Sequence, residues 1–254
     1  MGTLQGRGIC MGTINKKGIF FTFIAIAMMV VFILVFTPQA GISLEKDREA
    51  ISIRTATVDN YVSELQNDYF ETVLRATTYK TILSLIFYIN ETDSYITDLD
   101  SAFYEVMLNG TINGFPIDDI TGKKIMENST LTDWTKLTIN ISKDTLNVDT
   151  AIIITNVSVS QLDTWYIKSN LGINFTVKSN VAEWKKNINI TTTVSIEGFL
   201  DPYYLVNTNG LYANVINKST VEFNEWNITK VREHLRYGTY AHWENPDAPS
   251  FLMR

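Results

Sequence analysis

The hydrophobic pattern of the chain begins with an apolar run, Gly18–Phe36, that no charged residue interrupts. At about 1.5 Å per residue, a helix of this length spans the roughly 30 Å hydrocarbon core of a bilayer. A buried helix of a soluble domain is rarely apolar on every face. A cleaved secretory signal has a shorter apolar region and small residues at its cleavage site, where this chain has Pro38. The run therefore predicts a transmembrane helix over residues 18–37.

A second pattern predicts a long helical region over residues 38–108. Pro38 and Gly41 predict a break or kink, and no Gly or Pro follows before Asn109. We expect one amphipathic helix from about Ile42 to Tyr88, which packs either on its own β-domain or, as a stalk, against neighbouring copies. Two heptad lines predict its buried seam: Leu44, Ile51, Val58, Leu65, Thr72, Tyr79 and Ile86, with Arg48, Thr55, Val62, Tyr69, Ala76 and Leu83.

Beyond the turn dipeptides Asn109-Gly110 and Asn113-Gly114, the period changes from helical to alternating. The short spacings favour an antiparallel meander. Residues 109–254 are therefore expected to form a β-rich domain that ends in a short helix, and the fold class is expected to be α+β. The predicted strands are 137–142, 151–159, 165–177 and 188–196, of which the third is either one strand or two that turn near Asn170–Gly172; the predicted late helix is 222–236.

The charged residues on either side of the predicted membrane helix predict its orientation. Lys16 and Lys17 directly precede the run, whereas the far flank, Glu45–Glu49, has mixed charge. The positive-inside rule then puts residues 1–17 in the cytoplasm and the bulk of the chain outside the cell. The net charge is −6 and the basic residues are scattered, which argues against a nucleic-acid partner. Cys10 is the single cysteine, so the outer part forms no intrachain disulfide.

Acceptor motifs of the form N-x-[ST] all follow the apolar run, which suggests N-glycosylation outside the cell. The alternative explanation is the richness of β-strands and turns in Asn and Thr. The motifs begin at Asn90, Asn109, Asn128, Asn140, Asn156, Asn174, Asn189, Asn217 and Asn227.

No motif for enzymatic chemistry stands out in the sequence. His234 and His242 lie outside any zinc-binding pattern, and Asp118-Asp119 lacks the spacing of an EF-hand and favours a solvated turn. We expect no catalytic residue, no metal and no cofactor. The segment Gly198–Gly210 is rich in aromatic residues between turn dipeptides; we expect Tyr203, Tyr204 and Leu205 to pack under the helix, with an exposed contact surface as the alternative.

The segment Asn15–Ile19 resembles a class III signal peptide of archaeal type IV pilin-like proteins, in which a basic pair and a small residue precede a long apolar helix. The resemblance implies a processing site formed by Lys16, Lys17, Gly18 and Ile19, with cleavage after Gly18. It also implies that the apolar helix forms a filament core and that a β-rich head follows its helical continuation. Phe23 stands where bacterial pilins carry Glu. The segment Gly198–Gly210 further resembles uncharacterised archaeal membrane-anchored surface proteins.

These patterns together predict a non-enzymatic, single-pass, pilin-like surface protein that acts in filament assembly, envelope structure or adhesion. The expected partners are the lipid bilayer and further copies of the chain or other pilin-like envelope subunits. The alternative is a single-pass membrane protein with a ligand-sensing or enzymatic domain outside the cytoplasm.

Overall fold

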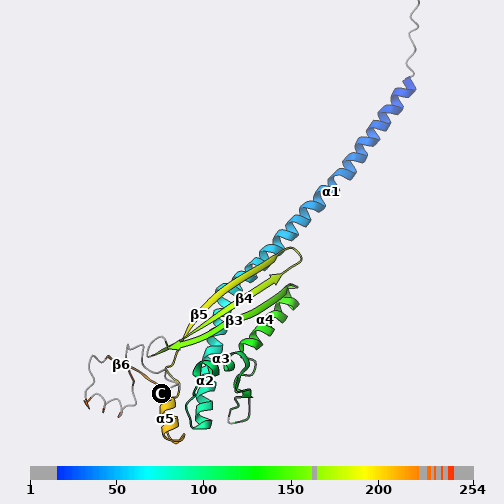
Figure 1. The fold of residues 1–254 in the computed structure, drawn as a ribbon. Helices are drawn as coiled ribbons and strands as arrows, with labels where there is room; N and C mark the ends of the chain where they lie inside the picture. Colours follow the sequence, from blue (N-terminus) through cyan, green and yellow to red (C-terminus); the bar gives the residue numbers. More distant parts are fainter. Residues whose placement is uncertain are drawn as a thin grey trace, which may run out of the picture. The chain divides into compact units, whose positions relative to one another are not determined.

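The computed structural model describes residues 16–119, 121–161 and 165–222, together with residues 228–229, 232, 236 and 240–242. Its helical elements are α1 (Lys16–Glu64), the π-helical turn η1 (Leu65–Tyr69), α2 (Phe70–Thr92), α3 (Leu99–Asn109), α4 (Leu131–Leu146) and α5 (Pro202–Asn207). Its strands are β1 (Thr111–Ile112), β2 (Phe115–Pro116), β3 (Asp149–Gln161), β4 (Tyr166–Lys178), β5 (Glu183–Ser195), β6 (Lys218–Glu222) and β7 (Tyr240–His242) (Figure 1). The predicted α+β class, with helices and antiparallel sheets, is confirmed.

The chain divides into two units, residues 1–55 and 56–254. In the first unit, all residues that the structure describes belong to α1. The helix continues through Pro38–Gly41, so a break there is wrong, and the alternative of a kink stays a prediction. A proline removes a single hydrogen bond of the helical ladder, and the turns on both sides keep the helix intact.

Within the part of the chain that the structure describes, no helix is both long enough and apolar enough to span a membrane. The side chains of residues 18–23, 34 and 36 lie outside the described part. The membrane assignment of Gly18–Phe36 stays a prediction.

In the second unit, a π-helical turn joins α1 to α2 and shifts by one residue the sequence positions that form the buried face of the helix. The amide of Phe70 donates to the carbonyl of Leu65, five residues back, which adds one residue to the turn. One residue corresponds to about 100° of rotation. Val58, Val62 and Leu65, the first residue of the turn, are buried as the heptad lines predict, whereas Ile51 is exposed. After the turn, Phe70, Val73 and Thr77 are buried where those lines predicted Tyr69, Thr72 and Ala76. Ile86, further along α2, is buried as predicted.

The three long strands form an antiparallel meander in the order β3-β4-β5, which confirms the predicted meander. Side chains alternate along β4, so that Ile167, Leu171 and Phe175 are buried, whereas Tyr166 and Asn174 are exposed. The predicted strands 151–159 and 188–196 lie within β3 and β5.

The region 165–177 forms one strand, and the alternative of two strands turning near Asn170–Gly172 is wrong. Gly172 lies in the middle of β4, opposite a β-bulge between Ile154 and Asn156 of β3. Only a glycine leaves room for this bulge, because a Cβ atom at position 172 would lie 2.6 Å from Oγ1 of Thr155. No turn is needed there.

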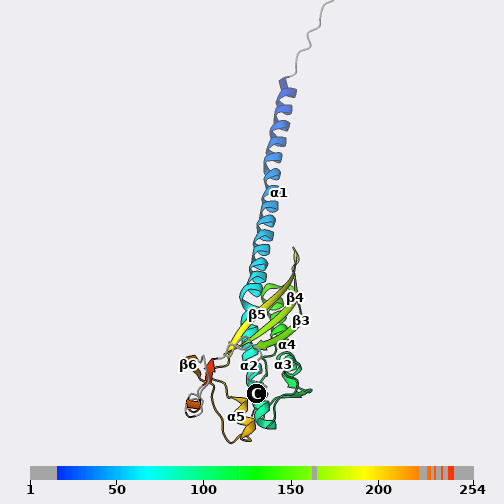
Figure 2. The ribbon, with the colours of Figure 1, turned by 60° about the vertical axis from the view of Figure 1, so that its left-hand side comes forward.

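The inner face of this sheet packs on helices. Helix α2 lies against β4 and β5, and α4 lies against β3 (Figures 1 and 2). The Phe70 and Phe175 rings, from α2 and β4, have centroids 5.5 Å apart. The core of the second unit therefore lies between these helices and one face of the sheet.

The segment 137–142, predicted as a strand, is part of helix α4 instead. Thr130 caps the helix: its hydroxyl accepts from the amide of Asp133, and the Asp133 carboxylate accepts from the amide of Thr130. The buried positions Leu131, Thr138 and Ser142 follow helical spacing. The alternation of Leu137, Ile139 and Ile141 with polar residues matched a strand only within a short window, and the cap and the longer helical period decide the structure.

The described remainder of this unit consists of short elements. β1 and β2 form a hairpin, and β6 pairs in parallel with β7. Helix α5 packs against α2. Of the late helix predicted at 222–236, residues 228, 229, 232 and 236 are helical, Glu222 ends β6, and the other residues lie outside the described part.

Candidate functional site

The residues of the predicted processing site lie at the start of the described chain. Lys16 is the first helical residue of α1, and Lys17, Gly18 and Ile19 follow it within the first turns. The side chains of these four residues lie outside the described part. The structure therefore places the motif on a helix and leaves its use as a cleavage site a prediction.

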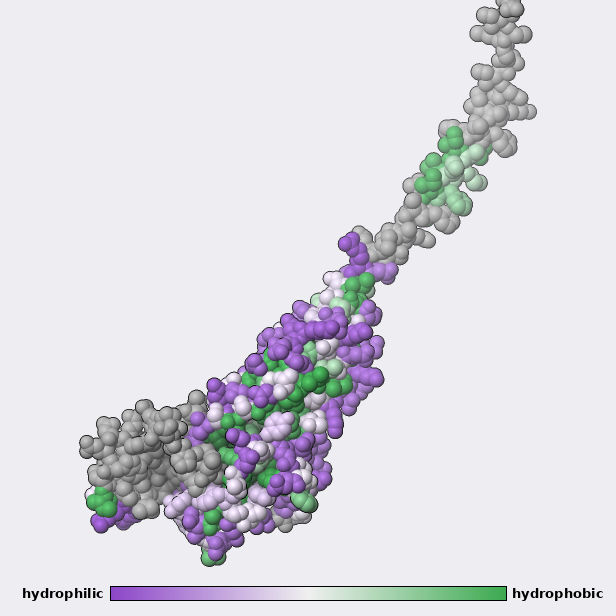
Figure 3. Space-filling model, in the orientation of Figure 1, coloured by the Kyte–Doolittle hydropathy of each residue, from purple (hydrophilic) through white to green (hydrophobic). Residues whose placement is uncertain are grey.

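The apolar segment of α1, Ile24–Val35, is exposed on every side. Each of its described side chains is exposed, and the exposed fractions of the larger ones run from 44% for Ile24 to 71% for Met28. In Figure 3, the coloured residues of this segment are all in the hydrophobic, green range. Since a helix repeats every 3.6 residues, these consecutive positions occupy all faces of the helix. Contiguous exposed apolar surfaces are typical of sites that contact other proteins or membranes.

The glycan acceptors that the structure describes are mostly exposed. Seven of the eight described acceptor asparagines are exposed, and Asn90, in α2, is half-buried. Asn227 lies outside the described residues. The exposed acceptors are Asn109, Asn128, Asn140, Asn156, Asn174, Asn189 and Asn217.

Three of these acceptors gather on the outer face of the sheet. Asn156 pairs with Gly172, and Gly172 pairs with Asn189, so these residues form one row across β3, β4 and β5. Asn174 lies two residues along β4 from Gly172 and therefore points to the same face. The sequence does not distinguish these three from the other motifs, because the strand register that brings them together is not visible in it.

A polar ladder runs beside this row. The Asn170 side-chain amide donates to the Ser158 hydroxyl at 3.2 Å, and the Thr191 hydroxyl donates to Oδ1 of Asn170 at 2.8 Å. Ser158 and Thr191 are the third residues of the motifs at Asn156 and Asn189. The ladder therefore connects two acceptor motifs, on the outer strands β3 and β5, through Asn170 of the central strand β4.

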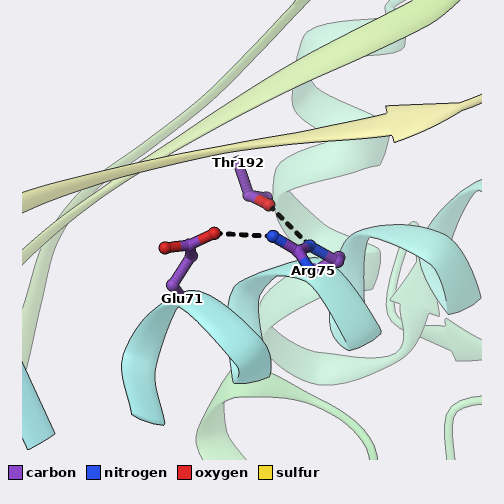
Figure 4. Close-up of polar contacts among 3 residues, drawn as sticks. All are labelled: Glu71, Arg75 and Thr192. Carbon is purple, nitrogen blue, oxygen red and sulfur yellow. Dashed lines mark hydrogen bonds and ion pairs between the residues drawn. The ribbon is translucent and has the colours of Figure 1, made fainter. Parts of the chain in front are cut away.

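The charged groups of the second unit serve local structure. Arg75 bridges Glu71, one turn earlier in α2, at 2.6 Å and donates to the Thr192 hydroxyl of β5 at 3.3 Å (Figure 4). Glu105 accepts from the Thr111 hydroxyl at 2.7 Å and from the amides of Asn113 and Gly114, and these bonds lower the pKa of its carboxyl.

Asp119 fits the predicted turn. Its Oδ1 accepts from the amide and hydroxyl of Thr121 and from the amide of Lys123, and the hydrogen bonds to Thr121, followed by that to Lys123, lower the pKa of the carboxyl. Within the described chain, no three His, Cys, Asp or Glu side chains are grouped so that they could hold a metal. His242 lies in β7, and His234 lies outside the described residues.

The segment Gly198–Gly210 forms a capped helical turn rather than an open site. Asp201 accepts from the amide of Tyr203 at 2.9 Å and begins α5. Leu205 is buried, as the packing interpretation requires, Tyr204 is half-buried, and Tyr203 is exposed. Burial raises the pKa of Tyr204. The segment therefore anchors α5 through Leu205 and leaves one tyrosine at the surface.

Comparisons of the chain with protein-family models, with curated proteins and with solved structures each find no match.

Proposed function

We propose that the chain is a non-enzymatic, membrane-anchored surface protein of pilin-like organisation, which acts in filament assembly, envelope structure or adhesion. The observation that supports this proposal is the exposure of every described side chain in Ile24–Val35 of α1. Contact of such an apolar surface with water is unfavourable, whereas lipid tails or the helices of other copies would cover it. The helix then holds the protein in the bilayer and, in an assembly, packs among copies of itself.

The second unit supplies a head of the kind this organisation needs. A long helical segment packs along one face of an antiparallel sheet, and the other face of the sheet carries exposed polar residues. In this proposal Lys16 and Lys17 mark the cytoplasmic end of the membrane helix, and the head lies outside the cell. The exposed acceptor asparagines fit a location outside the cell, where N-glycosylation would modify them.

The alternative is a head that senses a ligand or catalyses a reaction. It would draw on the exposed aromatic surface at Tyr203 and Tyr212 beside α5. The ring centroids of Tyr204 and Tyr212 lie 5.5 Å apart in an edge-to-face arrangement, which is typical of aromatic side chains packed together. We favour the structural role because Arg75, Glu105 and Asp119 each make contacts that hold neighbouring segments of the head.

The anchor is tested by paired charge substitutions within α1. Each Lys at the centre of a membrane helix costs about 3 kcal/mol, so Met28→Lys with Val31→Lys should move the protein out of the carbonate-resistant membrane fraction. Ile51→Lys with Ile53→Lys is the matched control, because these residues are exposed apolar positions of the same helix outside the run. Equal loss from the membrane in both pairs, or in neither, would count against the anchor.

A further inference from the structure

The described head separates the glycan acceptors into two chemical classes. In N-glycosylation a bond forms between the asparagine side-chain nitrogen and the anomeric carbon of a sugar, the bond from that carbon to a lipid-linked phosphate breaks, and the amide gives up one proton. The transferase reads the hydroxyl of the third motif residue together with the asparagine. On a folded protein, both groups must therefore be reachable from solvent on an extended backbone.

Two exposed asparagines fail this condition because their motif hydroxyls are buried. The motif at Asn140 ends in Ser142, which is 0% exposed and donates to the carbonyl of Ile139. The motif at Asn128 ends in Thr130, which is 5% exposed and holds the cap of α4. Asn128 itself has a positive φ of 55°, far from an extended backbone.

Two further motifs are closed by helical structure. Asn90 is half-buried in α2, and its motif hydroxyl, on Thr92, donates to the carbonyl of Tyr88. Asn109 ends α3, and its motif hydroxyl, on Thr111, donates to the carboxylate of Glu105 at 2.7 Å. In both motifs the asparagine lies in a helix, so neither motif offers an extended backbone in the folded head.

The motifs at Asn156 and Asn189 meet the condition in full, and the motif at Asn174 meets it with a half-buried hydroxyl, that of Thr176. Asn156, Asn174 and Asn189 are exposed residues of extended strands. The hydroxyls of Ser158 and Thr191 lie on the same exposed face, where their bonds to Asn170 are solvent-exposed and exchange readily with other donors. Gly172 has no side chain in the middle of this face. Oδ1 of Asn189 lies 3.2 Å from the position that a Cβ atom of residue 172 would take.

We propose that Asn156, Asn174 and Asn189 are the asparagines that the sheet of the folded head presents for glycosylation, with a lipid-phosphate-linked sugar as the donor. Asn217 is exposed too, but the side chain of its motif residue Ser219 lies outside the described part, and the proposal does not extend to it. The outer face of the β3-β4-β5 sheet is then a glycan-bearing surface. Neighbouring strands lie about 4.8 Å apart, so the three glycans stand close enough to cover the face together. This assignment rests on the proposed location of the head outside the cytoplasm.

The test is the glycan occupancy of each site in protein isolated from its native cell envelope, read by peptide mass spectrometry. Asn156→Gln, Asn174→Gln and Asn189→Gln should each remove one glycan mass. Asn187→Gln is the matched control, because Asn187 is exposed on the same face of β5 and belongs to no acceptor motif. Thr191→Val should abolish occupancy of Asn189, and Thr191→Ser should retain it.

Asn128→Gln and Asn140→Gln should leave the mass unchanged. Glycans on Asn128 or Asn140 would show that transfer precedes folding and would overturn the assignment, as would a bare sheet face. Digestion of intact cells by added protease separates this failure from that of the proposed function. A head that is cut but bare overturns only the assignment, whereas a head that is protected overturns the location as well.

Discussion

The Tyr69 hydroxyl lies 2.7 Å from Oγ1 of Thr138 and joins the π-helical turn to helix α4. Thr138 gives its own hydroxyl proton to the carbonyl of Trp134, so Tyr69 is the donor in the bond between them. This bond fixes the turn at which the buried face of the long helix changes, and it joins segments that are far apart in the sequence.

Loss of this bond should destabilise the head measurably. Tyr69→Phe removes the donor and should lower the free energy of unfolding by about 1 kcal/mol. Thr138→Val should cost more, because Thr138 is buried and the carbonyl of Trp134 also loses its second donor. Urea unfolding of the detergent-solubilised chain, followed by circular dichroism, gives both values. A double variant whose cost equals the sum of the two single costs would show that the residues are not coupled.

The π-helical turn contains one inserted residue, and the core should depend on that count. A further Ala inserted after Asn67 would rotate Phe70, Val73 and Thr77 by about 100° relative to the face of Val58 and Val62, so we expect loss of cooperative unfolding. Deletion of Asn67 removes the inserted residue and keeps these side chains on one face of a regular α-helix, so the head should remain folded. Asn67→Ala is the control, because Asn67 is exposed, and it should change stability by less than about 0.5 kcal/mol. An insertion variant as stable as the deletion variant would contradict this register.

Gly172 should tolerate no larger residue. A Cβ atom there would lie 2.6 Å from Thr155 Oγ1, so Gly172→Ala should destabilise the head by about 1–3 kcal/mol. Thr155→Ala removes that oxygen, and the double variant should recover much of the loss. Thermal unfolding of the three variants measures these losses of stability. If the double variant loses as much stability as Gly172→Ala alone, the strain does not come from Thr155.

The stability of the head should depend on Glu105 at acid pH. Hydrogen bonds from Thr111, Gly114 and Asn113 lower the pKa of this carboxyl from its ordinary value of 4.5. The unfolded chain then binds a proton before the folded one does, so this contribution is present above about pH 4.5 and is lost as the pH falls through the lower, folded value. The free energy of unfolding of Glu105→Gln, measured from pH 6 to pH 3, should fall less steeply than that of the parent. Identical slopes would exclude this role for Glu105.

Local patterns in the sequence predicted much of the fold, because the strands of the meander alternate cleanly over long stretches. Val58, Val62 and Leu65 likewise followed the heptad lines. The predictions failed where one residue changes the register. The π-helical turn has no sequence signature of its own, so Thr72 and Tyr79 were placed on the wrong face, and both are exposed.

Tertiary structure decided the other differences. Leu137 and Ile141 suit a strand over a few residues, yet the cap at Thr130 and the buried helical stripe of α4 prevail. The acceptor motifs were found from the sequence, but the burial of Ser142 depends on the packing of α4. A pattern of three residues carries no information about which hydroxyls the folded head conceals.

The most direct measurement for a pilin-like function is the identity of the first residue of the mature protein. Terminal peptide mass spectrometry of protein from the native envelope should find that the chain begins at Ile19, without Lys16 and Lys17. Gly18→Leu should block cleavage, whereas Gly41→Leu, in the same helix and outside the motif, should leave it unchanged. A mature chain that retains Lys16 and Lys17 would contradict the pilin-like assignment and would leave a static membrane anchor in its place.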